Sequence, residues 1–193
     1  MSFDPPAFRH QIKAILCDYV RAFGVPDEEH AVLRRQIEDG DDLHSRGTFP
    51  GHVTTSAFIL DHAGQLILLI HHRSLGRWLQ PGGHYEPPDD LAGSALREAI
   101  EETGLHGLVI DPWHMRSGLP IDIDSHRIPA RSERGEPEHW HHDFRYVLRA
   151  EDGDALRPDL REVHGAAWYH LQDLETMAPQ ALRNMRELGL VGP

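Results

Sequence analysis

Residues 82–105 read GGHYEPPDDLAGSALREAIEETGL, and this stretch decides the fold. Glu98, Glu101 and Glu102 stand at positions i, i+3 and i+4 of a helix predicted from about residue 90 to residue 103, with Gly104 as its stop. Side chains at this spacing share one helix face, where like charges cost about 0.2–0.5 kcal/mol per pair. Such a face is either a solvated charged surface or a site for hard cations such as Mg²⁺ and Mn²⁺, which prefer oxygen ligands.

Two glycines just upstream distinguish between these readings. Gly82 and Gly83 permit a tight loop whose backbone can approach a phosphate or a metal ion closely. The whole segment resembles the Nudix box, G-x(5)-E-x(7)-R-E-U-x-E-E-x-G-U, where U is a bulky apolar residue. Counted from Gly83, the residues that match are Arg97, Glu98, Glu101, Glu102, Gly104 and Leu105. Two positions depart from the pattern: Asp89 replaces a glutamate, and Ala99 is smaller than the usual apolar residue.

The resemblance implies both a fold and a chemistry. The fold class is α/β, a Nudix-type α/β/α sandwich with a mixed sheet. The cofactor is Mg²⁺ or Mn²⁺, and the reaction is hydrolysis of a pyrophosphate linkage in a nucleoside diphosphate derivative. The resemblance gives Arg97 the role of orienting and partly neutralising the glutamates. The metal ligands carried over by position are Glu98, Glu101, Glu102 and the backbone carbonyl of Gly82.

Two details of this site stay open at the sequence level. Asp89 keeps the charge of the family glutamate but is one methylene shorter, which predicts weaker or water-mediated contacts. The general base in the family is either the glutamate at position 98 or a residue from a later loop. The loop candidates in this chain are Glu133, Glu136 and Glu138.

The remainder of the chain supplies the other elements of the sandwich. An apolar stripe from Phe8 to Phe23 predicts one helix, and residues 27–38 predict a second. We therefore assign residues 1–50 to an N-terminal helical extension and residues 51–193 to a Nudix hydrolase domain. Runs of β-branched and aliphatic residues predict strands, and a helix is expected near the C-terminus. The expected strands cover residues 53–60, 65–72, 108–110, 121–128, 139–149 and 166–169, and the expected last helix covers residues 179–188.

Composition limits the partners. The 193 residues carry a formal net charge of −12, which repels a long nucleic-acid backbone. No apolar run approaches the roughly 20 residues of a membrane span, and we expect a cytoplasmic protein without a signal peptide. Cys17 is the only cysteine, so no intrachain disulfide can form. The partner we expect is a small phosphorylated nucleotide-type substrate, and a homodimer stays open.

The sequence gives two weak indications of the substrate. Pro120 follows Leu105 by fifteen residues, an interval that resembles ADP-ribose-cleaving members of the family, and coincidence is a serious rival explanation because the chain has 14 prolines. ADP-ribose or a nucleotide sugar is therefore one candidate. Four aromatic residues are candidates for stacking on a base, with core packing as the commoner role: Trp78, Tyr85, Trp113 and Trp140.

Two further stretches combine histidine with aspartate, DIDSH at residues 122–126 and HWHHD at residues 139–143, and they hold four of the 16 histidines. In each, Asp and His alternate, so that they share one face of a strand. We expect antiparallel pairing with His126 opposite His139 and Asp124 opposite His141. The four would then converge on a second site for a transition-metal ion; the alternative is a polar, solvent-facing side of a hairpin. The intervening loop carries three candidate phosphate-binding residues, Arg127, Arg131 and Arg134.

Two other functions compete with hydrolysis. A non-catalytic Nudix domain would sense a nucleotide or bind a protein partner, but such domains tend to lose the glutamates that this chain retains. An isomerase of the Nudix fold that acts on prenyl diphosphates would want a cysteine in its pocket. Cys17 lies instead in the N-terminal extension.

Overall fold

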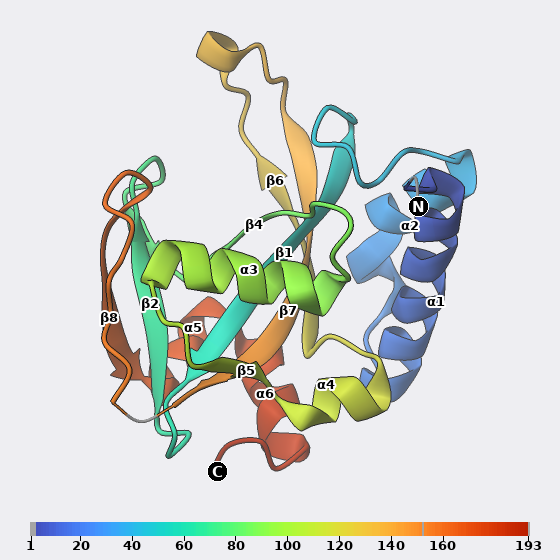
Figure 1. The fold of residues 1–193 in the computed structure, drawn as a ribbon. Helices are drawn as coiled ribbons and strands as arrows, with labels where there is room; N and C mark the ends of the chain where they lie inside the picture. Colours follow the sequence, from blue (N-terminus) through green and yellow to red (C-terminus); the bar gives the residue numbers. More distant parts are fainter. Residues whose placement is uncertain (1–2, 152, 193) are drawn as a thin grey trace.

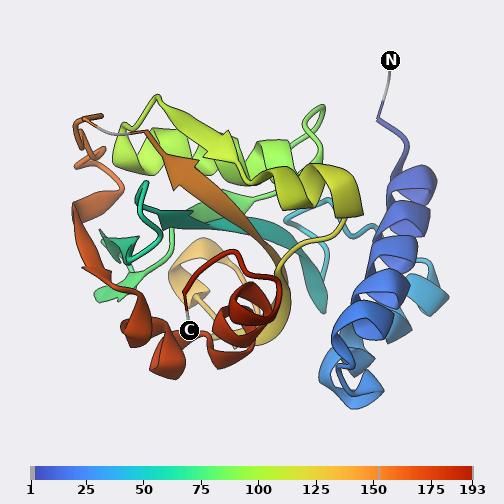
Figure 2. The same cartoon turned by 90° about the horizontal axis from the view of Figure 1, so that it is seen from below.

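The computed structural model describes residues 3–151 and 153–192. Within these residues one mixed sheet lies between helical layers (Figures 1 and 2). Its strands are β1 (Gly51–Leu60), β2 (Leu66–His72), β3 (Arg77–Leu79), β4 (Gly82–His84), β5 (Leu108–Ile110), β6 (Asp122–Ile128), β7 (His139–Ala150) and β8 (Val163–His170). The helices are α1 (Pro5–Phe23), α2 (Ala31–Asp39), α3 (Leu91–Thr103), α4 (Pro112–Ser117), α5 (Leu174–Met177) and α6 (Pro179–Glu187), with 3₁₀ turns η1 (Asp27–His30), η2 (Ser132–Arg134) and η3 (Leu171–Asp173).

Strand β1 is the centre of the sheet. It pairs in parallel with β7 over its whole length, from Gly51 opposite Trp140 to Leu60 opposite Arg149. Its antiparallel neighbours are β2 and β4. All ten residues of β1 are buried, which explains its nearly continuous run of apolar and small polar side chains. The outer strands then pair antiparallel, β3 and β8 with β2, and β5 and β6 with β7.

The two faces of the sheet are covered by different helices. Helices α3 and α4 lie on one side, and α5 and α6 lie on the other (Figure 2). Along β1, Val53, Ala57 and Ile59 belong to the core on the α3 side, whereas Phe58 and Leu60 belong to the core beneath α6. The expected α/β/α sandwich with a mixed sheet is confirmed.

Helix α3 is delimited by its caps. The Asp90 side chain accepts a hydrogen bond of 2.7 Å from the Gly93 N–H, and Gly104 adopts φ 69° where its N–H closes the helix on Ile100. Leu91, Ala95 and Ala99 are buried against the sheet. The small side chain of Ala99 is fully buried, so it allows a close contact of α3 with the sheet, and this contact also brings the buried Glu102 against β4.

The N-terminal helices share the core of the sandwich. Phe8, Ile12 and Tyr19 of α1 are buried in the same hydrophobic cluster as Val53 and Phe144 of the sheet. Phe8 also stacks on Tyr85, with ring centroids 4.5 Å apart. The extension predicted for residues 1–50 is therefore packed onto the sheet, while its division from residues 51–193 as a separate domain stays a prediction.

Four of the helices and strands have no counterpart among the predicted elements: β3, β4, α4 and the four-residue α5. Strands β3 and β4 have three residues each and lie in a segment dense in Gly and Pro, so no periodicity marks them. Helix α4 has only six residues.

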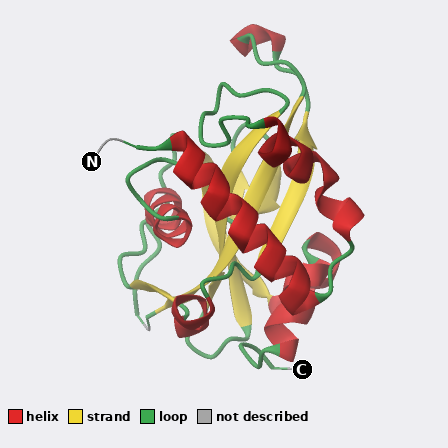
Figure 3. Ribbon diagram, turned by 90° about the vertical axis from the view of Figure 1, so that its right-hand side faces the viewer, coloured by secondary structure: helices red, strands yellow, loops and turns green. Residues whose placement is uncertain are grey.

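The β6–β7 hairpin projects beyond the sheet and ends in η2 (Figures 1 and 3). No helix among the described residues is both long and apolar enough to cross a membrane.

Candidate metal centre

The glutamate face of α3 lies against the glycine strand β4. The backbone N–H of Gly82 donates a hydrogen bond of 2.8 Å to Oε2 of Glu102. A Cβ atom on Gly83 would lie 2.6 Å from Cδ of Glu98, closer than any real contact. Glycine is needed here because the backbone of β4 must come this close to two carboxylates.

Burial makes two of the carboxylates hard to ionise in the metal-free protein. Glu102 is 3% exposed, and its burial raises its pKa to about 8, although the Gly82 N–H lowers it. Burial also raises the pKa of Glu98, against the opposing effect of Arg97. Glu101 on the same face is more exposed. A cation would relieve the cost of charging the two buried carboxylates.

Arg97 is surrounded by carboxylates. Its Nη1 lies 2.9 Å from Oε1 of Glu98 and 3.2 Å from Oε2 of Glu101, and its Nε lies 3.3 Å from Oδ2 of Asp89. Asp89 thus contacts Arg97 directly in spite of its shorter side chain. One guanidinium among these acids leaves excess negative charge, and the oxygen donors suit Mg²⁺ or Mn²⁺. The residues therefore fit the metal that the resemblance implies.

A further carboxylate near this face was missed at the sequence level. The charge of Glu162, just before β8, contributes to the raised pKa of Glu102. No local pattern marks Glu162, because only the return of β8 beside β2 brings it here. Two of the predicted loop glutamates are engaged elsewhere, Glu136 with Arg46 at 3.5 Å and Glu138 with Arg127 at 3.4 Å. Glu133 lies in η2 at the hairpin tip.

The two histidine-rich strands pair antiparallel as expected, but the expected register is wrong by two residues. His126 lies opposite His141, Asp124 lies opposite Asp143, and His139 lies opposite Ile128. A bridge between Arg131 and Glu136 closes the hairpin tip, which fixes this pairing. Since a shift of two residues keeps every side chain on its face, the predicted shared face is retained.

Asp124 is part of a buried ionic network. Arg145 donates to Asp122 at 3.0 Å, to Asp124 at 2.7 Å and to Asp143 at 3.0 Å. Tyr19 of α1 donates to Asp122 at 3.0 Å. His126 Nδ1 lies 2.7 Å from the same Asp124 oxygen that Arg145 contacts.

His141 gathers with two histidines that the sequence prediction did not include in its second site. Potential ligand atoms of His52, His84 and His141 all lie within 4.8 Å of one another. The His139 ring lies 5.2 Å from that of His141, and the His126 ring lies 5.8 Å from it. Burial, reinforced by neighbouring histidines, lowers the pKa of His84 to about 4 and that of His141 to about 2. Both imidazoles are therefore neutral at pH 7.

The predicted phosphate-binding arginines lie on the hairpin. Arg127 stacks over the Trp140 ring at 5.2 Å and contacts Glu138. Arg131 forms the backbone bridge with Glu136. The side chain of Arg134 lies outside the described part of the structure. The phosphate-binding role of the three stays a prediction.

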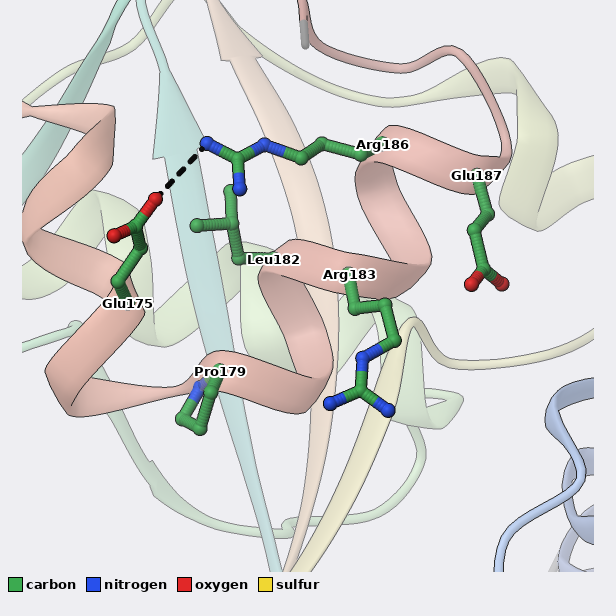
Figure 4. A pocket seen from close by; sticks show the side chains of 6 residues that line it. All are labelled: Glu175, Pro179, Leu182, Arg183, Arg186 and Glu187. Atoms are coloured by element: carbon green, nitrogen blue, oxygen red, sulfur yellow. Dashed lines mark hydrogen bonds and ion pairs between the residues drawn. The ribbon is translucent and has the colours of Figure 1, made fainter.

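A surface hollow on the other side of the sheet is a separate feature (Figure 4). It lies along α5 and α6 and is lined by Glu175, Pro179, Leu182, Arg183, Arg186 and Glu187. Arg186 pairs there with Glu175 at 3.2 Å. The hollow contains none of the α3 glutamates, so it is not the candidate metal centre.

The structure combines an α/β/α sandwich with a helix whose glutamates lie against a glycine strand. A model of the NUDIX domain matches residues 50–188. The chain therefore belongs to the Nudix hydrolase family, as the resemblance of residues 82–105 implied.

Comparisons with individual proteins agree with this family. The chain is 27% identical over 134 residues to a probable DHNTP pyrophosphohydrolase of Lactococcus lactis, which covers 69% of this chain and 76% of that protein. It is 32% identical over 123 residues to the m7GpppN-mRNA hydrolase NUDT17 of Danio rerio, covering 58% of this chain and 39% of that one. The C. elegans Ap4A hydrolase in a binary complex has a TM-score of 0.51 at 18% identity, over 72% of this chain and 97% of that chain, and so shares the fold.

Proposed function

We propose that this protein is a metal-dependent hydrolase that cleaves a pyrophosphate linkage in a nucleoside diphosphate derivative. The observation that carries the proposal is the placement of the buried Glu102 and the half-buried Glu98 against the glycine strand β4, with Glu101 on the same helix face. These three glutamates would hold Mg²⁺ or Mn²⁺, together with the Gly82 carbonyl. When bound, such an ion polarises phosphoryl oxygens and lowers the pKa of an attacking water.

The chain's own residues position this centre. Arg97 holds Glu98 and Glu101 by direct contacts, which limits their rotamers and offsets part of their repulsion. The Gly82 N–H fixes one oxygen of Glu102 and leaves the other free to act as a ligand. This arrangement favours catalysis over a purely binding Nudix domain, because a nucleotide sensor has no need of buried carboxylates that resist ionisation.

Proton removal from the attacking water is assigned to Glu98 or to Glu162. Glu98 has a raised pKa, which moves it toward the range of a general base at neutral pH. Among the later-loop glutamates we favour Glu162, since its charge acts on Glu102. Glu136 and Glu138 are instead paired with arginines on the hairpin side.

An exposed aromatic surface supports a nucleotide substrate. Trp78 of β3 is 36% exposed, and its ring lies 5.2 Å from the rings of both His71 and Tyr169. Trp78 precedes Gly82 by four residues in the chain, and its exposed ring is the candidate on which a base would stack. Tyr85 is instead buried against Phe8. ADP-ribose and nucleotide sugars are candidate substrates of this class, but Pro120 is buried before β6 and offers them no direct contact.

A substrate panel tests the proposal. ADP-ribose, a nucleotide sugar, a dinucleoside polyphosphate, a nucleoside triphosphate and inorganic pyrophosphate are incubated with Mg²⁺, with Mn²⁺ and with EDTA, and products are identified by mass. We expect metal-dependent release of a nucleotide product from at least one nucleotide. Trp78→Leu should raise KM for that nucleotide while leaving kcat within a few-fold. Nucleotide binding without cleavage of any compound would instead favour the sensing domain.

A further inference from the structure

A cluster of histidines lies on the sheet face opposite to α3. Thr55 of β1 points to α3, where its hydroxyl donates to Ser94, and a side chain at Gly83 would point to Glu98. Because neighbours along a strand alternate, His52 and His84 point to the other face. His141 lies directly opposite His52 in the β1–β7 pair and shares that face. Three adjacent strands, β4, β1 and β7, thus each contribute one imidazole.

The spacing of these rings matches that of ligands around one metal ion. The ring centroids are 5.0 Å apart for His52 and His84, 4.9 Å for His52 and His141, and 5.3 Å for His84 and His141. With Zn–N bonds of about 2.0–2.1 Å in a tetrahedral arrangement, the centroids of bound imidazoles lie roughly 5 Å apart. The three rings therefore already stand at coordination spacing.

Hydrogen bonding leaves the required nitrogens free. His52 is 1% exposed, and its Nδ1 faces the Thr48 carbonyl oxygen at 3.4 Å, which favours a lone pair on Nε2. Among the described residues, neither Nε2 of His52 nor Nε2 of His141 has a hydrogen-bond partner. Buried polar atoms are normally satisfied, so two orphaned imidazole nitrogens in one cluster point to a ligand between them.

We propose that His52, His84 and His141 bind one transition-metal ion of the Zn²⁺ type. Three neutral imidazoles favour Zn²⁺ and similar ions over Mg²⁺, so this site is chemically distinct from the glutamate centre. The His139 ring lies beside these three, 5.1 Å from that of His52, and its Nδ1 is held by the Pro137 carbonyl at 2.8 Å. The ion ties β4, β1 and β7 together at the base of the hairpin.

Cobalt and zinc binding to the tag-free, metal-stripped full chain tests the site. Titration with Co²⁺ is followed by visible absorption, and bound Zn²⁺ is counted by elemental analysis after gel filtration. We expect about one equivalent with the spectrum of a four-coordinate nitrogen site. His84→Gln and His141→Gln should each abolish that spectrum. His164→Gln is the matched control and should change nothing, because His164 is exposed and its ring pairs with that of His71, at 5.2 Å, rather than with the cluster.

Two further measurements keep the outcome decisive. Glu101→Gln combined with Glu102→Gln should leave the Co²⁺ spectrum intact, which separates this site from the glutamate centre. If a glutamine variant folds poorly, a second variant, His84→Asn, replaces it, since His84 is partly exposed. Zn²⁺ should then raise the melting temperature of the wild type and of His164→Gln, but not that of His84→Asn. No four-coordinate spectrum in wild type, or one that survives both His84→Gln and His141→Gln, overturns the proposal.

Discussion

The backbone N–H of Gly82 donates to Oε2 of Glu102 over 2.8 Å, and this contact joins the glycine strand to the glutamate helix. It fixes how closely β4 approaches α3 and which oxygen of Glu102 remains free. Next to it, the backbone of Gly83 lies close to the carboxylate of Glu98, which is possible because Gly83 has no side chain. The site therefore depends on the close approach of the β4 backbone to α3 as much as on the glutamates themselves.

The two glycines should respond differently to alanine. In Gly83→Ala the new methyl group meets the flexible end of Glu98 at 2.6 Å, so Glu98 is displaced and the fold is kept. A misplacement of about 1 Å can reduce turnover about 100-fold. In Gly82→Ala the new Cβ lies 2.6 Å from the Thr55 carbonyl oxygen, which is backbone, and destabilises by about 1–3 kcal/mol. Urea unfolding and turnover of both variants check this. Equal loss of stability in the two would contradict it.

Restoring the family glutamate tests the departure at position 89. Asp89 already contacts Nε of Arg97 at 3.3 Å, and the longer side chain of Asp89→Glu should reach the same guanidinium. We expect turnover within a few-fold of wild type and a tighter dependence on metal concentration. Complete loss of activity would show that the site has been rebuilt around the shorter side chain.

The sequence predicted the main elements and the glutamate centre because both depend on local patterns. The helix of residues 91–103 follows from its apolar spacing and its Asp and Gly caps, and Glu98, Glu101 and Glu102 follow from the same helix. The histidine cluster depends on the parallel pairing of β1 with β7, residues far apart in the chain, so His52 could not be found locally. The predicted register of the β6–β7 hairpin is wrong for a related reason, because no sequence pattern marks the bridge between Arg131 and Glu136 that sets it.

The raised pKa of Glu102, about 8, predicts how stability changes with pH in the metal-free protein. Between the unfolded pKa of about 4.3 and the folded value, the folded state holds a proton that the unfolded state has lost. The free energy of unfolding should therefore fall as pH rises through this window, by at most about 1.4 kcal/mol per unit. Glu102→Gln should weaken this dependence, measured by urea unfolding in EDTA at pH 6, 7 and 8. An unchanged slope in the variant would assign the effect to other groups.

Mg²⁺ should act in the opposite direction. The metal binds the ionised carboxylate, so its stabilising effect should be larger at pH 8 than at pH 6. The shift in melting temperature on adding Mg²⁺ at both pH values measures this. A larger shift at the lower pH would contradict a carboxylate centre that includes Glu102.

The buried network around Arg145 predicts a large stability effect remote from α3. Arg145 is 9% exposed and forms ion pairs with Asp122, Asp124 and Asp143. Arg145→Met removes the counter-charge of three carboxylates and should cost about 3–5 kcal/mol. Tyr19→Phe removes only the 3.0 Å hydrogen bond to Asp122 and should lower the free energy of unfolding by about 1 kcal/mol. This value measures how much that bond contributes to the packing of α1 on the sheet. Urea unfolding of both variants at pH 7 gives these values, and a neutral Arg145→Met would show that the network adds no stability.

The turnover of Glu101→Gln and Glu102→Gln tests the central claim most directly. Each change keeps the size of the side chain and removes one charge from a site for a hard cation. On whichever nucleotide the wild type cleaves, each variant should lose at least about tenfold in kcat at saturating Mg²⁺, with its circular dichroism spectrum unchanged. The control Glu175→Gln removes a glutamate paired with Arg186 near α6 and should keep full activity. Wild-type turnover in either Glu101→Gln or Glu102→Gln would contradict the assignment of this centre.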